Sequence, residues 1–290
     1  MKILLTGSGG QLAQELQPIL SSVGEVIAGD RTLLDLSQPD SIRQLMGEIK
    51  PDIVVNAGAY TAVDKAESEP ELANTVNGIA PGILAEECEK EGAALIHIST
   101  DYVFDGSQGY PYSETDATNP LGVYGNSKLA GEVSIKEAAI RHIIIRTAWV
   151  YGNAGKGNFV KTMLRLGKDR EEIRVVADHI GSPTWTGDLA VAISQIISHI
   201  KPEIFGTYQY TNSGVASWYD FAIAIFEEAK QLGFPLKVQR VIPITTGEYP
   251  TPAKRPAYSV LSSAKISAVL GNYPPHWRQG LRQMLAREAR

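Results

Sequence analysis

The sequence is almost without cysteine, since Cys88 is the only one among its 290 residues. A single thiol cannot form an intramolecular disulfide, and such a chain fits a reducing compartment such as the cytoplasm. Cys88 lies between Leu84 and Gly92, in a stretch with helical spacing. We therefore expect its thiol to be packed or partly buried, and we do not expect it to act as a nucleophile.

Long apolar runs are also missing from the sequence. No stretch of about 18 consecutive apolar residues occurs, so no membrane span is predicted. Near the start of the sequence, Lys2 is followed by only three apolar residues, Ile3 to Leu5, before Gly7. That run is too short for the core of a signal peptide. We expect no membrane partner.

A surplus of positive charge is absent too. The 27 lysines and arginines are outnumbered by 32 aspartates and glutamates, which gives a net charge of −5. A nucleic-acid-binding surface needs a basic face, so the composition argues against nucleic acid as a partner. The five histidines are scattered without the spacing of metal ligands, and we expect no metal. A few local basic side chains can still serve a small anionic ligand.

The first 150 residues alternate short apolar runs with helical patterns. The clearest helix spans 42–49, where apolar residues follow the i, i+3, i+4, i+7 spacing. Helical patterns also occur at 79–92 and at 11–20, where Pro18 should kink or end the helix. The predicted strands are 3–5, 25–28, 53–56, 94–99 and 143–146. This alternation predicts βαβ units, and hence an α/β fold with a doubly wound parallel sheet of the Rossmann type.

The second half of the chain is less regular. We predict helices over 187–200 and 218–232, and a strand over 206–211. A proline-rich stretch around 243–256 has no secondary-structure period, and it is either an extended loop over a binding site or a plain surface connection. We expect two domains. The dinucleotide-binding domain takes residues 1–148 and 187–212, and a smaller α/β substrate-binding domain takes residues 149–186 and 213–290.

A glycine-rich loop follows the first predicted strand. Gly7, Gly10 and Ala13 fit the pattern G-x-x-G-x-x-[GA]. The first glycine allows a tight turn, the second lets the backbone approach a pyrophosphate, and the third small residue allows close packing of helix on strand. The N-terminus of the following helix offers free N–H groups to phosphate. The position of the loop, directly after an N-terminal strand, favours dinucleotide binding over an ordinary turn.

An acidic residue closes the second predicted strand. Asp30 lies about 20 residues beyond the glycine loop, where an acid usually binds the ribose 2′-hydroxyl of NAD. Arg31 comes next, and a guanidinium at this place can hold the 2′-phosphate of NADP. Asp35 follows nearby and is a candidate for approaching the adenine. The cofactor is therefore NADH or NADPH.

Two segments point to proton transfer at a carbonyl. Tyr124 and Lys128 form a Y-x-x-x-K pair, which a helix places on one face. A free tyrosine has a pKa near 10, and a neighbouring ammonium should lower it, so that Tyr124 can give a proton to a carbonyl oxygen. Thr100, or Ser99 beside it, ends a predicted strand and can hydrogen-bond the developing alkoxide. The glycine loop, the hydroxyl and Y-x-x-x-K occur in the order this chemistry requires.

Longer segments carry a family resemblance. They are residues 54–67, 99–106, 120–125 with 128–132, and 146–151. Through them the chain resembles the extended short-chain dehydrogenase/reductases along its whole length. Within that family it is similar to reductases that act on the 4-keto group of a nucleotide-linked deoxysugar. The resemblance therefore implies a nucleotide-sugar substrate.

The resemblance also implies roles for individual residues. It makes Thr100, Tyr124 and Lys128 catalytic. It places further residues along the cofactor, namely Gly10, Gln11, Leu12, Asp30, Asp35, Leu36, Ala59, Tyr60 and Thr61. It places others near the substrate, namely Thr61, Val63, Thr100, Asp101, Tyr102 and Trp149. A homodimer is compatible with the resemblance, although the acidic residues that bridge a dimer through a metal in some relatives have no identifiable counterpart here.

Other activities stay open beside this one. Related dehydratases carry Asp-Glu after the threonine, whereas this chain has Asp101 and Tyr102, so elimination of water is not expected. An epimerase of the same family would have to retain its nicotinamide through a cycle. A non-catalytic alternative is a partner protein like the regulatory subunit of methionine adenosyltransferase, which resembles the same reductases. The intact set of Thr100, Tyr124 and Lys128 weighs against that alternative.

Overall fold

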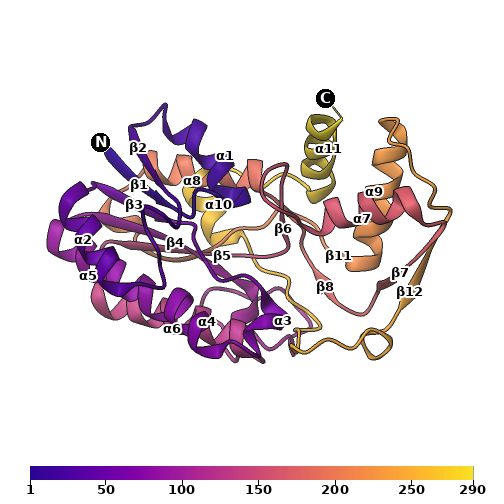
Figure 1. Cartoon of the computed structure of the whole chain (residues 1–290), viewed down its shortest axis with the longest axis horizontal. Helices are drawn as coiled ribbons and strands as arrows, with labels where there is room; N and C mark the ends of the chain where they lie inside the picture. Colours follow the sequence, from indigo (N-terminus) through magenta and orange to yellow (C-terminus); the bar gives the residue numbers. More distant parts are fainter. Residues whose placement is uncertain (290) are drawn as a thin grey trace.

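The computed structural model describes residues 1–289, and its centre is a six-stranded parallel sheet (Figure 1). The strand order is β10-β5-β4-β3-β1-β2, and each neighbouring pair is parallel. The strands are β1 (Lys2–Thr6), β2 (Glu25–Gly29), β3 (Ile53–Asn56), β4 (Ala94–Thr100), β5 (His142–Thr147) and β10 (Gly206–Gln209). The predicted doubly wound α/β fold of the Rossmann type is confirmed.

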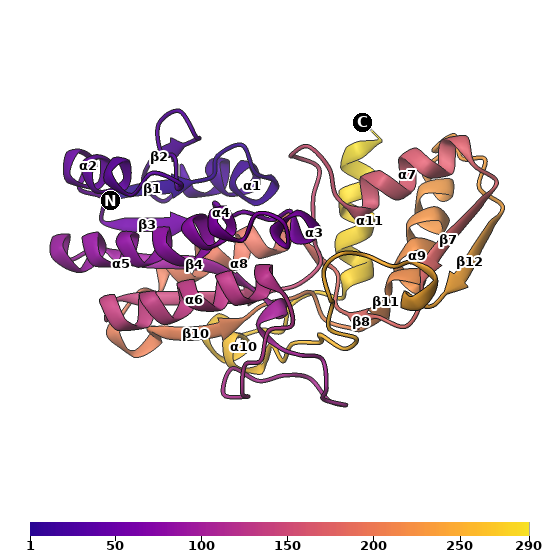
Figure 2. The same cartoon turned by 60° about the horizontal axis from the view of Figure 1, so that its bottom comes forward.

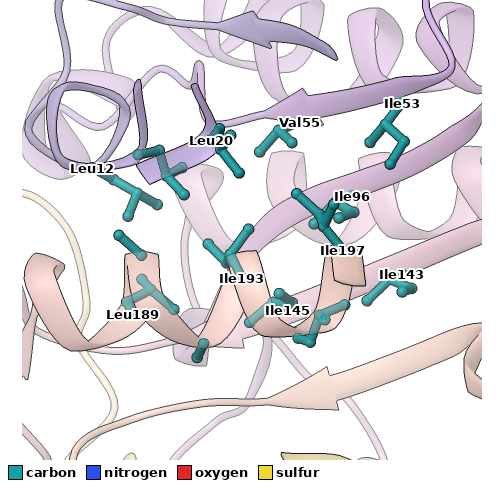
Figure 3. Packing of buried hydrophobic residues seen from close by; sticks show 14 of the residues in the cluster. Leu12, Leu20, Ile53, Val55, Ile96, Ile143, Ile145, Leu189, Ile193 and Ile197 are labelled. Atoms are coloured by element: carbon teal, nitrogen blue, oxygen red, sulfur yellow. The ribbon is translucent and has the colours of Figure 1, made fainter. Parts of the chain in front are cut away.

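Helices cover both faces of the sheet because successive strand residues point to opposite sides. Ile3 and Leu5 of β1 belong to one core, which they share with α1 (Gln11–Leu20), α8 (Thr186–Ser198) and α10 (Ala264–Leu270). Figure 3 shows α1 and α8 residues packed around the strands in this core. Leu4 points to the other core, with α2 (Pro39–Ile49), α5 (Ala80–Glu91) and α6 (Val123–Ala138). None of the helices within residues 1–289 is both long and apolar enough to cross a membrane.

Short helical pieces lie near the carboxyl ends of the central strands. After β3 come α3 (Val63–Ala66), α4 (Pro70–Asn74) and the π-helical turn η1 (Thr75–Ile79), which leads into α5. After β4 comes the 3₁₀ turn η2 (Asp101–Val103). The 3₁₀ turn η3 (Pro202–Ile204) lies instead at the amino-terminal end of β10, which it precedes. The carboxyl ends of the strands of a parallel sheet lie at one edge. The segments that follow β1, β3, β4 and β5 therefore meet there.

A second, smaller unit lies beside the sheet (Figures 1 and 2). Its core is built by α7 (Phe159–Asp169), α9 (Trp218–Gln231) and α11 (Trp277–Glu288). The strands β7 (Glu172–Val176) and β12 (Arg240–Ile244) pair in parallel at its far end. Two further pairs lie closer to the sheet, β6 (Val150–Tyr151) with β9 (Thr184–Trp185), and β8 (Ile180–Gly181) with β11 (Ala216–Ser217). The 3₁₀ turn η4 (Thr246–Glu248) follows β12.

The predicted domain boundaries stay a prediction, but the structure shows how the segments pack. Ile266 of α10 is buried in the core that α1 and α8 share with the sheet. This helix lies within 213–290, the range that we assigned to the substrate-binding domain. Trp277 and Leu281 of α11, a few residues later, are buried in the core of the second unit.

Proline placement departs from expectation in the second half. The stretch from Pro243 onward was expected to lack regular structure, but Pro243 lies inside β12. The strand β12 pairs only with β7 within the described residues, so one of its edges needs no backbone donor. In the first half, α1 runs two residues beyond Pro18 and ends at Leu20. Cys88 is buried in α5, which confirms the expected packing of its thiol.

Candidate active site

The glycine loop lies between β1 and α1, as the sequence predicted. Gly7 has φ +68, in the left-handed region that favours glycine. A Cβ atom at Gly7 would lie 2.6 Å from the Cα of Gly58, so the two backbones touch. The N–H of Gly10 donates to the carbonyl of Gly7 over 2.8 Å, and Gly10 caps α1 without a side-chain acceptor. The N–H groups of the first turn of α1 therefore remain available for a phosphate.

Gln11 and Leu12, which begin α1, make different contacts. The side chain of Leu12 is buried in the core beneath the sheet, so only its backbone can reach a cofactor. The Gln11 amide donates to the carbonyl of Val150 over 3.0 Å, and Asn158 donates to Gln11 over 3.2 Å. Gln11 thus joins the start of α1 to the second unit. Gly155 also lies against Gln11.

The end of β2 lies close to the glycine loop. There the N–H of Ser8 donates to the carbonyl of Gly29 over 3.0 Å. Asp30 is exposed there, and its carboxylate accepts from the hydroxyl and the N–H of Thr32 and from the N–H of Leu33. These hydrogen bonds, the Thr32 hydroxyl first, lower the pKa of Asp30. Arg31 is exposed beside it. The ionised Asp30 and the exposed Arg31 both lie in the region where the sequence predicted the cofactor ribose.

The next acidic residue, Asp35, is held by its own turn. Its carboxylate accepts from the N–H and the hydroxyl of Ser37, and these bonds lower its pKa. Leu36 is buried, and a Cβ at Gly58 would lie 2.7 Å from its side chain. Asp35 and Leu36 therefore lie beside the crossing of the glycine loop with the segment after β3.

The segment after β3 is fixed from the α6 side. The N–H of Tyr60 donates to the Asn77 side chain over 2.9 Å, and Asn77 donates back to the carbonyl of Tyr60 over 2.9 Å. Asn77 also donates to the hydroxyl of Ser127 on α6 over 3.1 Å. Ala59 and Tyr60 are half-buried, Thr61 is exposed, and Val63 begins α3. This ladder places the 57–61 segment next to the helix that carries Tyr124.

Thr100 and Tyr124 come together at the carboxyl end of β4. Thr100 is the last residue of β4 and is buried, and its hydroxyl donates to Asp101 over 3.0 Å. Tyr124 lies in the first turn of α6, and the Thr100 hydroxyl acts to lower its pKa. The ring of Tyr102 packs edge-on against the Tyr124 ring. Tyr102 therefore contacts both residues, since its N–H donates to the Thr100 hydroxyl over 3.2 Å and its ring packs on Tyr124.

The expected effect of Lys128 on Tyr124 is corrected by the structure. Burial raises the pKa of Tyr124 to about 12, the Thr100 hydroxyl opposes this shift, and the charge of Asp101 adds to it. The Lys128 ammonium does not lower it, because Lys128 points into the sheet. Its Nζ donates to the carbonyl of Ile98 over 2.6 Å and lies 3.2 Å from His97 Nε2. Burial lowers the pKa of Lys128 to about 8, against the opposing charge of Glu132.

Asp101 is a buried carboxyl group that directly follows Thr100. It is 2% exposed, and its Oδ2 atom has no hydrogen-bond partner among residues 1–289. Burial raises the pKa of Asp101 to about 6, and contacts with Ser259 and Thr100 oppose the shift. An uncompensated acceptor at this depth is costly unless a ligand or solvent donor satisfies it. Asp101 is therefore a candidate acceptor for a substrate hydroxyl.

Trp149 lies at the same edge of the sheet, two residues beyond the end of β5. Its backbone has φ +47, a conformation that costs a non-glycine residue about 1–3 kcal/mol. The indole stacks on Trp218, with ring centroids 3.5 Å apart and planes at 7°. It also covers Gly181, where a Cβ would lie 2.6 Å from the ring. Trp218 belongs to α9 and was not among the predicted site residues, since no local pattern links it to position 149.

The proline-rich stretch contributes a second residue that the sequence did not reveal. Arg255 donates to the Asp64 carboxylate over 2.7 Å, and the N–H of Ala253 donates to the same group over 3.2 Å. Arg255 also interacts with the hydroxyl of Tyr102. The stretch therefore reaches Asp64, next to the predicted site residue Val63, and its role as a loop over a binding site stays a prediction. Asp64 directly follows Val63, within the segment 54–67 that carries the family resemblance, but its partner lies 191 residues away.

The chain is similar to known proteins along its whole length. The family described as the RmlD substrate binding domain matches residues 1–290. A dTDP-4-dehydrorhamnose reductase from Escherichia coli K12 is 45% identical, over 98% of this chain and 97% of that protein. The crystal structure of a dTDP-4-dehydrorhamnose reductase from Clostridium acetobutylicum superposes with a TM-score of 0.92 at 40% identity, and the match covers all of both chains. The reductase from Bacillus anthracis, solved in complex with NADP, has a TM-score of 0.91 at 40% identity and 99% coverage of each chain.

Proposed function

The chain belongs to the family described as the RmlD substrate binding domain, and we propose that it reduces dTDP-4-dehydro-L-rhamnose to dTDP-L-rhamnose with NADH or NADPH. It is an oxidoreductase, and curated relatives at 40–45% identity over nearly the whole chain carry the name dTDP-4-dehydrorhamnose reductase. The observation in the structure that carries the proposal is the placement of Thr100 at the end of β4 and of Tyr124 in the first turn of α6, with Tyr102 in contact with both. A hydroxyl and a phenol at one point suit the reduction of a carbonyl.

The residues present fit a dinucleotide. The backbone contact between Gly7 and Gly58 leaves no room for side chains, and the first turn of α1 keeps its N–H groups free. A pyrophosphate would be held there, and Asp30 or Arg31 would meet the adenosine ribose. When bound, the cofactor supplies the hydride. We also propose that residues 1–148 and 187–212 carry this site, and that 149–186 and 213–290 carry the sugar.

Side chains of the protein would donate the proton and orient the substrate. Tyr124 would protonate the C4 oxygen as the hydride reaches the carbon, and Thr100 would hydrogen-bond the same oxygen. A phenol whose pKa lies well above neutrality holds its proton firmly until charge develops on the oxygen. Lys128 would turn from the Ile98 carbonyl toward the nicotinamide ribose. Asp101, Tyr102, Val63 and Trp149 would hold the sugar nucleotide.

The proposal is tested by supplying the purified protein with NADPH or NADH and a 4-keto sugar nucleotide made from dTDP-glucose by dehydration and epimerisation. We expect the absorbance of the reduced nicotinamide to fall while dTDP-L-rhamnose forms in equal amount. Sugar conversion without net oxidation of the cofactor would support the epimerase alternative instead. Cofactor binding without any turnover across a panel of such sugars would support the regulatory-subunit alternative.

Two further points are proposals of the same kind. The single, buried Cys88 suits a reducing compartment, so we place the reaction in the cytoplasm. The relatives' names describe nucleotide-sugar chemistry, and the acidic chain offers no reason to expect nucleic acid. A homodimer stays a prediction, and light scattering over a range of protein concentrations would test it.

A further inference from the structure

A row of buried polar side chains runs under the site, from Lys128 to the glycine loop. Thr6, Asn56 and His97 lie on three adjacent strands and are paired in register, Thr6 with Asn56 and Asn56 with His97. All three are completely buried. Their side chains are linked, since Thr6 Oγ1 lies 2.7 Å from Asn56 Oδ1 and Asn56 Nδ2 lies 3.0 Å from His97 Nδ1. Lys128 Nζ closes the row, 3.2 Å from His97 Nε2.

The other end of the row touches the cofactor loop. The N–H of Gly58 donates to Thr6 Oγ1 over 3.1 Å. Gly58 is the residue whose backbone lies against Gly7. The hydroxyl of Thr6 is therefore one hydrogen bond away from the glycine crossing, and His97 joins that crossing to Lys128.

The hydrogen bonds that the structure shows in this row do not fit a charged Lys128. A neutral imidazole has one donor nitrogen and one acceptor nitrogen. A charged Lys128 has no lone pair, so His97 must accept at Nε2 and carry its proton on Nδ1. The amide of Asn56 must then present its oxygen to Nδ1. In the structure the Asn56 nitrogen faces Nδ1 instead, which suits an uncharged Lys128 that accepts from Nε2–H.

A doubly protonated ring does not resolve the conflict. Burial lowers the pKa of His97, and the charge of Lys128 lowers it further. The charged group whose field reaches Lys128 is Glu132, one turn along α6, and Glu132 is itself paired with Arg146 of β5 over 2.7 Å. His97 therefore stays neutral, and its tautomer must follow the charge of Lys128.

We propose that His97 is a positioning residue that couples the charge of Lys128 to the orientation of the Asn56 amide, and thereby to the Thr6 hydroxyl beneath the glycine loop. The inference rests on the proposed role of Lys128. Between the two arrangements, the Lys128–His97 pair releases one proton to solvent and the ring proton moves from Nδ1 to Nε2. The Asn56 amide turns by half a rotation, which exchanges its oxygen and nitrogen in place. No other covalent bond changes.

The direct test is nitrogen NMR of the protein labelled with ¹⁵N-histidine, because ring nitrogen shifts identify the tautomer. The His97 signals are assigned as those missing in His97→Gln. Spectra are recorded below the Lys128 pKa of about 8 for the parent and for Lys128→Met, which removes the charge and keeps the length. We expect Nδ1–H in the parent and Nε2–H in Lys128→Met. The same tautomer in both proteins would overturn the proposal. This readout needs no turnover, so it stands or falls separately from the proposed reaction.

Kinetics of two His97 variants give the second test. Glutamine can accept from Lys128 with its oxygen and donate to Asn56 with its nitrogen, so His97→Gln should keep kcat at low pH. Leucine offers neither, so His97→Leu should lower kcat at least tenfold with little change in the KM of the sugar nucleotide. His199→Gln is the matched control, because His199 is exposed and its ring bonds the carbonyl of Gln195, four residues earlier. Equal kcat in folded His97→Leu and His199→Gln would contradict the coupling.

Discussion

The ring of Tyr102 lies edge-on against the ring of Tyr124, with centroids 5.4 Å apart and planes at 79°. Tyr102 is in turn in contact with Arg255, which is paired with Asp64. The proposed acid of the reaction is thus packed against a residue that a distant loop holds in place. An aromatic pair of this geometry contributes about 0.5–1.5 kcal/mol beyond the area it buries.

Tyr124→Phe removes the phenol proton and keeps the ring that packs on Tyr102. General acid help is typically worth about 10²–10⁴-fold, so kcat should fall by that order. Cofactor affinity, measured by fluorescence titration, should change little because the hydroxyl acts after binding. Tyr110→Phe is the control, since Tyr110 is 62% exposed. Near-parental turnover in Tyr124→Phe would remove Tyr124 from its proposed role.

Arg255→Ala should lower kcat/KM more than it lowers the stability of the fold. The Asp64–Arg255 pair is partly exposed, and such pairs contribute at most about 1 kcal/mol to stability. Loss of the contact with Tyr102 should lower kcat/KM roughly tenfold, which is about 1.4 kcal/mol. Steady-state kinetics beside thermal unfolding separates the two effects. Lys254→Ala, at the exposed neighbour, is the control. If both variants lose kcat/KM equally, the contact with Tyr102 is not the cause.

Both nicotinamide cofactors should be used, because Asp30 suits a ribose hydroxyl and Arg31 suits a phosphate. Their kcat/KM values should differ by less than about 1,000-fold, or roughly 4 kcal/mol. Asp30→Ala should shift the preference toward NADPH, since it removes a carboxylate whose hydrogen bonds keep it ionised. Asp40→Ala, at the start of α2, tests for a general effect of lost charge. An unchanged preference in Asp30→Ala would mean that the adenosine ribose lies elsewhere.

Asp101→Asn should make the protein more stable at neutral pH. The pKa of Asp101 is about 6 in the folded chain against 3.8 for the free group, so the folded state binds the proton more tightly. The stability gained from this tighter proton binding is fully present below pH 3.8. It is lost as the pH rises through about 6, the pKa in the folded chain. The ionised, buried carboxylate then costs up to about 3 kcal/mol. Urea unfolding of the parent and of Asp101→Asn at several pH values checks this. The prediction would be contradicted if the difference between their free energies of unfolding did not grow between pH 4 and 7.

Much of the fold could be predicted from local pattern. Ile3, Leu4 and Leu5 are apolar in succession because both faces of β1 are covered, and the glycine after them marks the turn into α1. The i, i+3, i+4 spacing of Ile42, Leu45 and Met46 is the buried face of α2. These features depend on residues that are close together in the sequence, and the periodicity of apolar residues therefore predicts them.

The parts of the site that could not be predicted depend on distant contacts. Trp218 stacks on Trp149, and Arg255 pairs with Asp64, across separations that no spacing rule covers. The direction of Lys128 is another case. A helix places it on the face of Tyr124, but the choice between the tyrosine and the Ile98 carbonyl depends on the depth of the helix against the sheet. Burial likewise reversed the expected shift in the pKa of Tyr124.

The two cores are built from alternating segments of the chain, and this limits how the protein can be divided into fragments. The chain leaves the sheet after β5, returns as α8 and β10, leaves again for α9, returns as α10 and ends in the second core with α11. No single cut yields two complete halves, since each fragment would lack segments of its own core. We therefore expect neither unit to be expressible alone as a continuous piece of chain. Exchanging the sugar-facing unit between relatives would require several junctions made together, so new specificity is more readily reached by point changes than by recombination.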